Sequence, residues 1–147
     1  MTDTTLIVKF RRTTPEARLP SKAHDSDACF DLYAAVHEEI FPGDTVLVPT
    51  GFDVAIPDGH VGLVCSRSGN ASKGLVVANA PGIIDAGYRG PLKVILHNNS
   101  DDPWRIERGD RIAQMMVQKV LPTMCTEVYE LDLDTDRGPS GFGSTGA

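Results

Sequence analysis

The chain has 147 residues, of which 41% are hydrophobic and 23% are charged, a size and composition that fit one globular domain. Twenty acidic and fourteen basic side chains give a formal net charge of -6, which argues against broad binding to nucleic acid backbones or anionic lipid. The apolar runs are far too short to span a membrane, no secretory signal is visible, and the three cysteines are odd in number. We therefore expect a cytoplasmic protein with reduced thiols, without membrane contact and without direct nucleic acid binding.

Glycine and proline divide the chain into short elements. Between these breaks apolar residues alternate with a period of two, which is typical of β-strands. The alternating sets are Phe52, Val54 and Ile56; Val61, Leu63 and Cys65; Leu92, Val94 and Leu96; and Ala113, Met115 and Val117. Many short strands at this spacing predict an all-β domain: a sandwich, a jelly roll or a small barrel.

Residues 28–40 carry a conflicting pattern. Their apolar residues recur at helical spacing, and Ala34 and Ala35 favour a helix. The pattern by itself predicts a helix here, whereas the surrounding chain predicts strands, so both readings stay open at this point.

The tetrapeptide Ser66-Arg67-Ser68-Gly69 is a candidate phosphate loop. A turn that glycine permits can aim successive N–H groups at phosphate oxygens, while Ser68 donates a hydrogen bond and Arg67 supplies a fork-shaped charge. A plain turn with one exposed arginine is the commoner explanation of such a tetrapeptide.

The segment from Asn79 to Tyr88 carries a candidate catalytic carboxylate, Asp85. An apolar run ends on this aspartate and turns through glycine to an aromatic residue. An aspartate beside Ile83 and Ile84 is expected to be partly desolvated, which favours proton acceptance. The alternative is a turn in which the Asp85 side chain caps its own β-hairpin, and spacing alone does not separate the two.

The last eleven residues, 137–147, are rich in glycine and serine and do not form core structure by themselves. A frayed terminus is the simple interpretation. The segment also holds one arginine, one aromatic residue and three hydroxyls without a carboxylate, which would suit a flap that orders over an anionic ligand.

Taken in order, these segments resemble the five motifs of the homotrimeric dUTPase family, and the resemblance covers nearly the whole chain. The five segments are residues 27–35, residues 66–69, Asn79 with residues 82–90, residues 109–115 and residues 137–146. The order of the segments makes the resemblance specific.

The resemblance implies hydrolysis of dUTP to dUMP and pyrophosphate by water that attacks the α-phosphorus, with Mg²⁺ bridging the phosphates. Asp85 would orient and activate that water, and Asp31 would hold Mg²⁺ through water, in keeping with the reluctance of this ion to lose its hydration shell. The phosphate side would be formed by Arg67, Ser68, Gly69 and Gln114, and the tail would close over it with Arg137, Gly143, Ser144 and Thr145.

The resemblance also implies how the nucleoside is recognised. Uracil would be read by Asn79 and by backbone groups of the hairpin residues Gly82, Ile83, Ile84 and Asp85. Tyr88 would pack under the sugar and exclude a ribose 2′-hydroxyl, and Lys93 would contact substrate from the following strand. Phe142 would stack on the base, as aromatic side chains do on exposed bases.

The fold implied is a jelly-roll-like β-barrel subunit of the trimeric dUTPase type. Residues 1–136 would form the β-barrel domain, and residues 137–147 would form a C-terminal arm that closes over an active site. Three active sites would be shared between the neighbouring chains of a homotrimer. This implication favours strands over a helix in residues 28–40.

Four positions depart from the commonest pattern of the family: Cys29, Asn70, Gly87 and Pro139. None of them removes a proposed catalytic group. The nearest rival activity is that of dCTP deaminase, which places a catalytic glutamate where this chain has Ile95. A module that binds nucleotide without turnover is a second rival, and the presence of Asp31, Asp85 and the tail argues against it.

Overall fold

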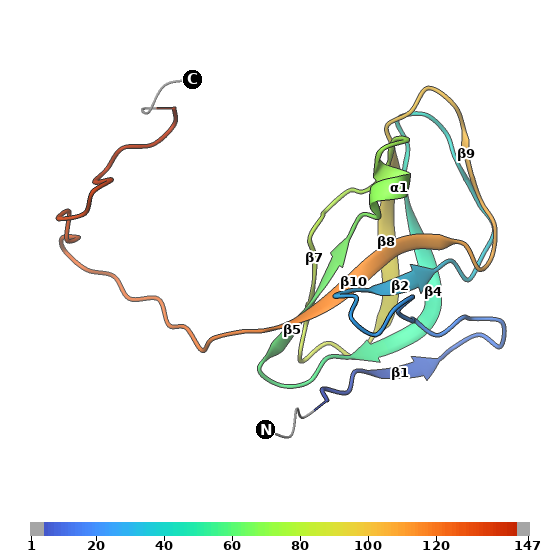
Figure 1. The fold of residues 1–147 in the computed structure, drawn as a ribbon, viewed down its shortest axis with the longest axis horizontal. Coiled ribbons are helices and arrows are strands. Elements are labelled where there is room, and N and C mark those ends of the chain that lie inside the picture. The colour runs from blue at the N-terminus through green and yellow to red at the C-terminus, as the bar shows by residue number, and fades with distance from the viewer. Residues whose placement is uncertain (1–4, 144–147) are drawn as a thin grey trace.

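The computed structural model describes residues 5–143, and β-strands dominate this part of the chain (Figure 1). The strands are β1 (Lys9–Arg12), β2 (Phe30–Tyr33), β3 (Glu38–Ile40), β4 (Thr45–Ala55), β5 (His60–Cys65), β6 (Leu75–Val77), β7 (Gly82–Asp85), β8 (Pro91–Asn98), β9 (Trp104–Ile106) and β10 (Arg111–Lys119), and one short helix, α1 (Ser68–Ala71), lies between β5 and β6. The prediction of an all-β domain is confirmed. No helix in the described residues is long and apolar enough to cross a membrane.

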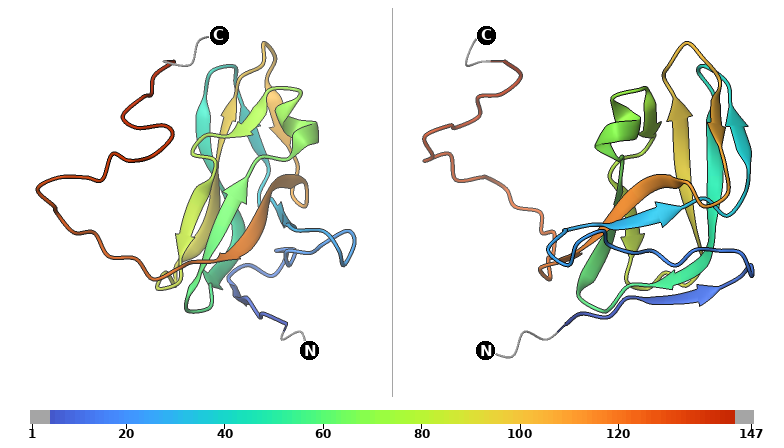
Figure 2. Two further views of the ribbon diagram at one scale, coloured as in Figure 1. Left: turned by 60° about the vertical axis from the view of Figure 1, so that its left-hand side comes forward. Right: turned by 45° about the vertical axis from the view of Figure 1, so that its right-hand side comes forward.

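The strands form three antiparallel sheets. One has the order β1-β4-β8-β6, a second has the order β2-β10-β5-β7, and β3 pairs with β9 in a third. Two further views show the two four-stranded sheets as layers on either side of the core (Figure 2). The sheets remain separate in their hydrogen bonding, so among the described residues the predicted barrel is not a closed ring.

The core lies between the layers and draws on all three sheets. Alternate residues of β8, namely Leu92, Val94 and Leu96, are buried as their spacing predicts. Met115 of β10 faces them from the second sheet, and Ile40 of β3 closes one end of the core. Burying an aliphatic side chain of this size contributes roughly 1.5–3 kcal/mol.

The alternation in β5 indicates a strand correctly but does not mark its buried face. Val61, Leu63 and Cys65, which form the alternating set, are half-buried, whereas Gly62 and Val64 are the buried residues of this strand. Apolar side chains stand on both faces of β5, so the pattern does not reveal which face meets the core.

Residues 28–40 form strands, and the helical alternative for them is wrong. β2 pairs with β10, where Leu32 lies beside Ala113, and β3 pairs with β9. Leu32 and Ile40 are fully buried in the core. Long-range pairing therefore outweighs the local helical preference of the two alanines.

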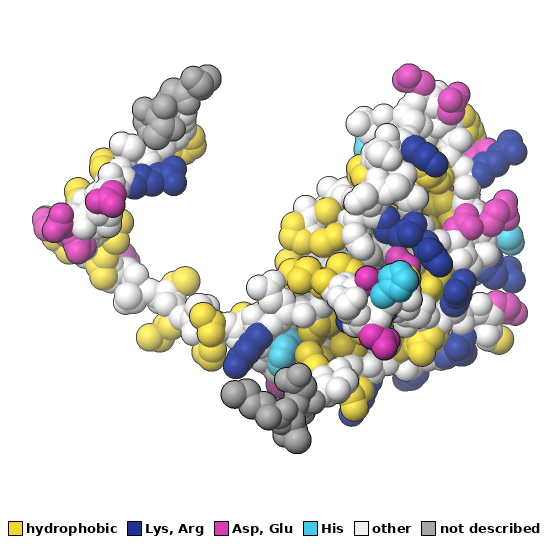
Figure 3. Space-filling view, in the orientation of Figure 1, with side chains coloured by type: hydrophobic (Ala, Val, Ile, Leu, Met, Phe, Trp, Pro, Cys, Tyr) yellow, Lys and Arg dark blue, Asp and Glu magenta, His cyan; other side chains and the backbone are white. Residues whose placement is uncertain are grey.

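The chain beyond Lys119 leaves the sheets. Residues 120–143 form no helix or strand and are mostly exposed. Figures 1 and 3 show this segment extending away from the layers, with hydrophobic and acidic side chains along it. The boundary predicted at residues 136 and 137 remains a prediction, since regular structure ends well before it.

Candidate functional site

Three segments that are far apart in sequence converge on the carboxylate of Asp31. Asp31 lies on β2, Arg67 follows β5, and Arg111 begins β10. Arg67 Nε donates to Asp31 Oδ1 at 3.0 Å, and Arg111 Nε lies 3.6 Å from Asp31 Oδ2. The Asp31 side chain is 16% exposed and that of Arg67 is 27% exposed, so the pair is partly shielded from water. Both carboxylate oxygens thus have a cationic partner.

Hydrogen bonds hold the phosphate-loop segment, residues 66–69, in place around this cluster. Gln114 Nε2 donates to the Ser66 carbonyl at 2.9 Å, and Ser66 Oγ accepts from the Val77 amide at 2.8 Å. Asn70 Nδ2 donates to the Arg111 carbonyl at 3.0 Å. The departure from the family pattern at position 70 therefore has a role in this chain, because the amide ties the end of the loop to β10.

The predicted phosphate ligands differ in exposure. Ser68 and Gly69 are exposed at the start of α1. A hollow of about 330 Å³ is lined by the polar residues Arg67, Asn70, Asp110 and Arg111 and by the apolar residues Leu75, Trp104, Ile106 and Ile112. Because Arg67 donates to Asp31 through Nε, the two terminal nitrogens of its planar guanidinium group are left to bind another group. The arrangement can offer a fork of N–H donors to an anion.

β7 and the start of β8 border a second pocket, of about 320 Å³. The β-hairpin expected for this segment is wrong, because β7 pairs with β5 whereas β8 pairs with β4 and β6 in the other sheet. The predicted residues Ile83, Ile84, Asp85, Tyr88 and Lys93 line the pocket, together with Leu47, Pro91 and Ile95. Most of this wall is apolar, with a carboxylate, a phenol and an ammonium at its edge. A pocket of this kind suits a flat, weakly polar group joined to a charged one.

Asp85 ends β7 in register with Val61 of β5. Its carbonyl accepts a hydrogen bond from the Tyr88 amide at 3.1 Å, which closes the turn. The Asp85 side chain is exposed in the single chain, so the desolvation that the sequence led us to expect is not found here. Within residues 5–143 its carboxylate makes no hydrogen bond, and this argues against the reading of Asp85 as a side-chain cap.

Asn79 lies beside Gly82, the first residue of β7. A Cβ at Gly82 would lie 3.2 Å from Asn79 Nδ2 and 3.4 Å from Asn79 Oδ1. Glycine at position 82 therefore leaves room for the Asn79 amide to lie against the backbone of β7.

Asp85 and the Asp31 cluster stand at different levels of the same sheet. Asp31 and Gln114 are level with Cys65, whereas Asp85 is level with Val61. Four positions of β5 separate these levels, about 13 Å along the strand. One chain therefore does not bring Asp85 together with Arg67 and Gln114.

The described part of the arm, residues 137–143, contributes nothing to either region in the single chain. Arg137 Nε donates to the Ser140 carbonyl at 3.0 Å, a local contact. Phe142 is completely exposed, and Gly143 is exposed beside it. Ser144 and Thr145 lie outside the described residues.

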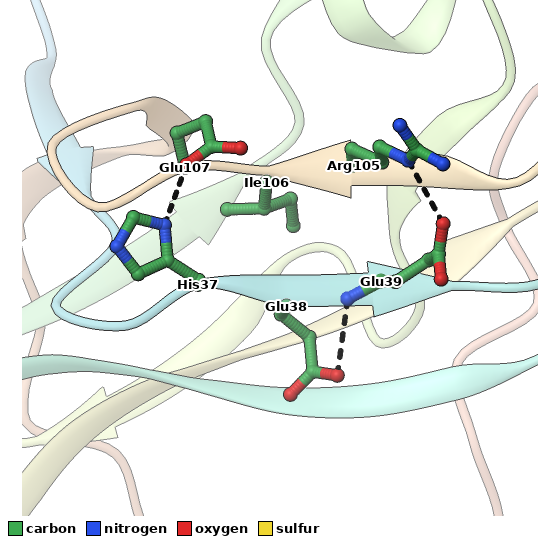
Figure 4. Close-up of a pocket in the computed structure, with 6 residues that line it drawn as sticks. All are labelled: His37, Glu38, Glu39, Arg105, Ile106 and Glu107. Carbon is green, nitrogen blue, oxygen red and sulfur yellow. Dashed lines mark hydrogen bonds and ion pairs between the residues drawn. The ribbon is translucent and has the colours of Figure 1, made fainter.

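A hollow of about 370 Å³ between β3 and β9 lies apart from these regions (Figure 4). Arg105 Nε pairs with Glu39 Oε1 at 3.0 Å, and His37 Nδ1 lies 2.5 Å from Glu107 Oε2. All four side chains are well exposed, and such ion pairs contribute little. We assign no ligand to this hollow.

Sequence reasoning missed the contributions of Leu47, Pro91, Arg111 and Asn70. Arg111 lies within the fourth motif, so its charge was visible but its partner Asp31 was not. Leu47 is an exposed leucine on β4, and nothing in its local pattern connects it with Asp85 and Tyr88. These assignments depend on contacts between segments that are distant in sequence.

Comparisons with known proteins agree with this geometry. The sequence matches the family described as dUTPase over residues 15–146. A protein of Mycolicibacterium gilvum (strain PYR-GCK) named deoxyuridine 5'-triphosphate nucleotidohydrolase is 51% identical over 141 residues, which cover 92% of each chain. A protein of the same name from Corynebacterium glutamicum is 51% identical over 148 residues, 99% of this chain and 98% of the relative. The solved dUTPase of Staphylococcus bacteriophage 80alpha with dUPNHPP has a TM-score of 0.89 and 31% identity, covering 97% of this chain and all of that one.

Proposed function

The chain belongs to the dUTPase family, and on that premise we propose that it hydrolyses dUTP to dUMP and pyrophosphate, with Asp85 acting on the attacking water. The observation that carries the proposal is the pair of regions described above. One offers cationic donors around Asp31, and the other is an apolar pocket edged by Asp85. Together they match the two halves of a nucleoside triphosphate.

The nucleoside half is bound at β7 and the turn that follows it. Asn79 and the backbone of Gly82, Ile83 and Ile84 read uracil, because an edge of fixed donors and acceptors leaves groups unpaired when cytosine is bound. Tyr88 packs under the sugar, and Lys93 contacts the substrate from β8. The apolar lining of the pocket supports this assignment.

The triphosphate half is bound by the loop after β5. The terminal nitrogens of Arg67 and the exposed Ser68 and Gly69 donate to phosphate oxygens, and Gln114 acts from β10. The Asp31 carboxylate fixes the guanidinium of Arg67, which would otherwise rotate freely. A guanidinium group held in this way selects the anion that it binds by geometry as well as by charge.

The donor set near Asp31 fits Mg²⁺ that is held through water. No group of three or more acidic, histidine or cysteine side chains that could cage a metal exists within residues 5–143. Both oxygens of Asp31 face arginines, which disfavours direct ligation but permits hydrogen bonds from metal-bound water. When bound, the ion would neutralise charge on the triphosphate.

Asp85 accepts a proton from the water that attacks the α-phosphorus. Its carboxylate is free of other hydrogen bonds in the described part of the chain and points from the rim of the pocket. General-base assistance of this kind is typically worth about 10² to 10⁴ in rate.

The complete site requires several copies of the chain. Asp85 stands about 13 Å along the sheet from the level of Asp31. A homotrimer would place β7 and Asp85 of one chain beside the phosphate loop of another. Residues 137–147 would then form an arm that closes over a neighbouring site, with Phe142 on the base and Arg137, Gly143, Ser144 and Thr145 near the phosphates.

A nucleotide panel tests the proposal. Pyrophosphate release would be measured from dUTP, UTP, dTTP and dCTP, with Mg²⁺ and after chelation. We expect rapid release from dUTP with the metal present and little from the others. Ammonia release from dCTP would instead indicate deamination, which the half-buried apolar Ile95 argues against because it offers no carboxylate.

A further inference from the structure

The ring of Tyr88 lies over the α-carbon of Gly90. A Cβ placed at Gly90 would lie 2.6 Å from Tyr88 Oη, 2.8 Å from Cζ and 3.0 Å from Cε2. Unbonded carbon and oxygen atoms do not approach so closely, since the optimum for two carbons is about 3.5–4.0 Å. The position of the ring thus depends on the absence of a side chain at residue 90.

A single hydrogen bond fixes the hydroxyl end of the ring. Tyr88 Oη donates to the Pro91 carbonyl at 2.8 Å. The phenol is thereby folded back across Gly90 onto the start of β8, and the ring forms part of the pocket wall.

The backbone beneath the ring is anchored more firmly than the ring itself. The Gly90 carbonyl accepts from the Val54 amide at 3.3 Å, and Pro91 is in register with Asp53 of β4. Tyr88, in contrast, is 41% exposed. A methyl group added at residue 90 would therefore displace the ring and leave the backbone in place.

We propose that Gly90 is a specificity-determining residue. Because it has no side chain, the Tyr88 ring can lie against its α-carbon, and in this position the ring leaves no space in the pocket for a 2′-hydroxyl on the sugar. This inference rests on the proposed function, in which Tyr88 packs under the sugar. Gly90 itself is a positioning residue, because it acts through the aromatic ring. Shape-based rejection of one small group in a pocket is typically worth about 10- to 200-fold.

The test is the ratio of kcat/KM for dUTP to kcat/KM for UTP. Gly90→Ala should lower this ratio by about tenfold or more, chiefly by raising the use of UTP. Gly87→Ala is the matched control, because it lies in the same turn and a Cβ there meets no atom within 4 Å. It should leave the ratio unchanged. Thermal unfolding of both variants should resemble that of the unsubstituted protein.

A double-mutant cycle separates the ring from the methyl group itself. Tyr88→Ala should lower the ratio, and Gly90→Ala added to it should have no further effect, since there is no ring left to displace. A further drop in the double variant would show that the methyl group acts directly, and would overturn the proposal. An unchanged ratio in Gly90→Ala would overturn the proposal as well, and so would loss of its folded state. Either result would show that the added methyl group does not act by displacing the Tyr88 ring.

The proposed function and the role of Gly90 can be refuted separately. If the unsubstituted protein releases no pyrophosphate from dUTP, the proposed function fails. If it does so, and Tyr88→Ala lowers the ratio while Gly90→Ala does not, only the role of Gly90 is refuted.

Discussion

Arg67 Nε lies 3.0 Å from Asp31 Oδ1, although the two residues are 36 positions apart in sequence. The bond connects the end of β5 to β2, and β10 lies between these two strands in the sheet. The bond uses the one guanidinium nitrogen that lies along the side chain. It leaves the terminal pair of nitrogens for another anion, so a single arginine can be held by the protein and still bind a phosphate.

Arg67→Lys should lower kcat/KM for dUTP by about tenfold to a hundredfold. A lysine keeps the charge but has one nitrogen, which cannot serve Asp31 and a phosphate in the geometry of a fork, and a charge-assisted hydrogen bond contributes about 1.5–3 kcal/mol. Steady-state pyrophosphate release measures the effect. Arg105→Lys, at an exposed ion pair between β3 and β9, is the control and should behave like the unsubstituted enzyme. Equal activity of the two variants would remove Arg67 from the phosphate site.

Asp85→Asn should reduce turnover by about 10² to 10⁴ because an amide does not accept the proton of the attacking water. Binding of a non-hydrolysable dUTP analogue, measured by calorimetry, should change little, since the amide has nearly the same shape. Asp58→Asn, at an exposed turn before β5, should leave both quantities unaltered. Undiminished turnover in Asp85→Asn would assign the base to another residue.

Removal of residues 137–147 should abolish most turnover and leave the fold intact. The described part of this segment makes only local contacts, so the sheets lose no packing when it is absent. Thermal unfolding by circular dichroism and pyrophosphate release would be compared side by side. Full activity of the truncated chain would restore the interpretation of the segment as a frayed end.

Phe142→Ala is a milder change in the same arm. Phe142 is fully exposed, so its removal should not alter the unfolding temperature. If it stacks on uracil, binding of dUTP should weaken by about 1–3 kcal/mol. Titration with a dUTP analogue measures this loss, and an unchanged affinity would contradict the stacking role.

The thiols should react in a set order. Burial, with a smaller contribution from Cys65, raises the pKa of the Cys29 thiol above its ordinary value of 9.0, whereas Cys125 is exposed in the segment that follows β10. Because the thiolate is the reactive form, Cys125 should be alkylated first at neutral pH, and the rate at Cys29 should keep rising as the pH passes 9.0. Peptide mapping by mass spectrometry follows both sites. Faster labelling of Cys29 at neutral pH would show that this thiol is more accessible than its position before β2 indicates.

Local patterns were sufficient where they reflect short-range physics. The period-two alternation in β8 predicted the strand and its buried face correctly, because a pleated strand necessarily points alternate side chains to opposite sides. The pattern was insufficient in β5, where Val64 is buried and Leu63 is not, since both faces carry apolar side chains. In residues 28–40 it favoured a helix until pairing with β9 and β10 decided for strands.

The sequence by itself determined that the chain is all-β, which family it resembles and which residue types could bind a triphosphate. Only the tertiary structure decided that the Asp31 carboxylate faces both Arg67 and Arg111, that Asn70 holds Arg111, and that Asp85 stands apart from them along the sheet. The physical reason is that strand propensity and turn formation act between near neighbours, whereas these contacts depend on strand register between segments separated by tens of residues.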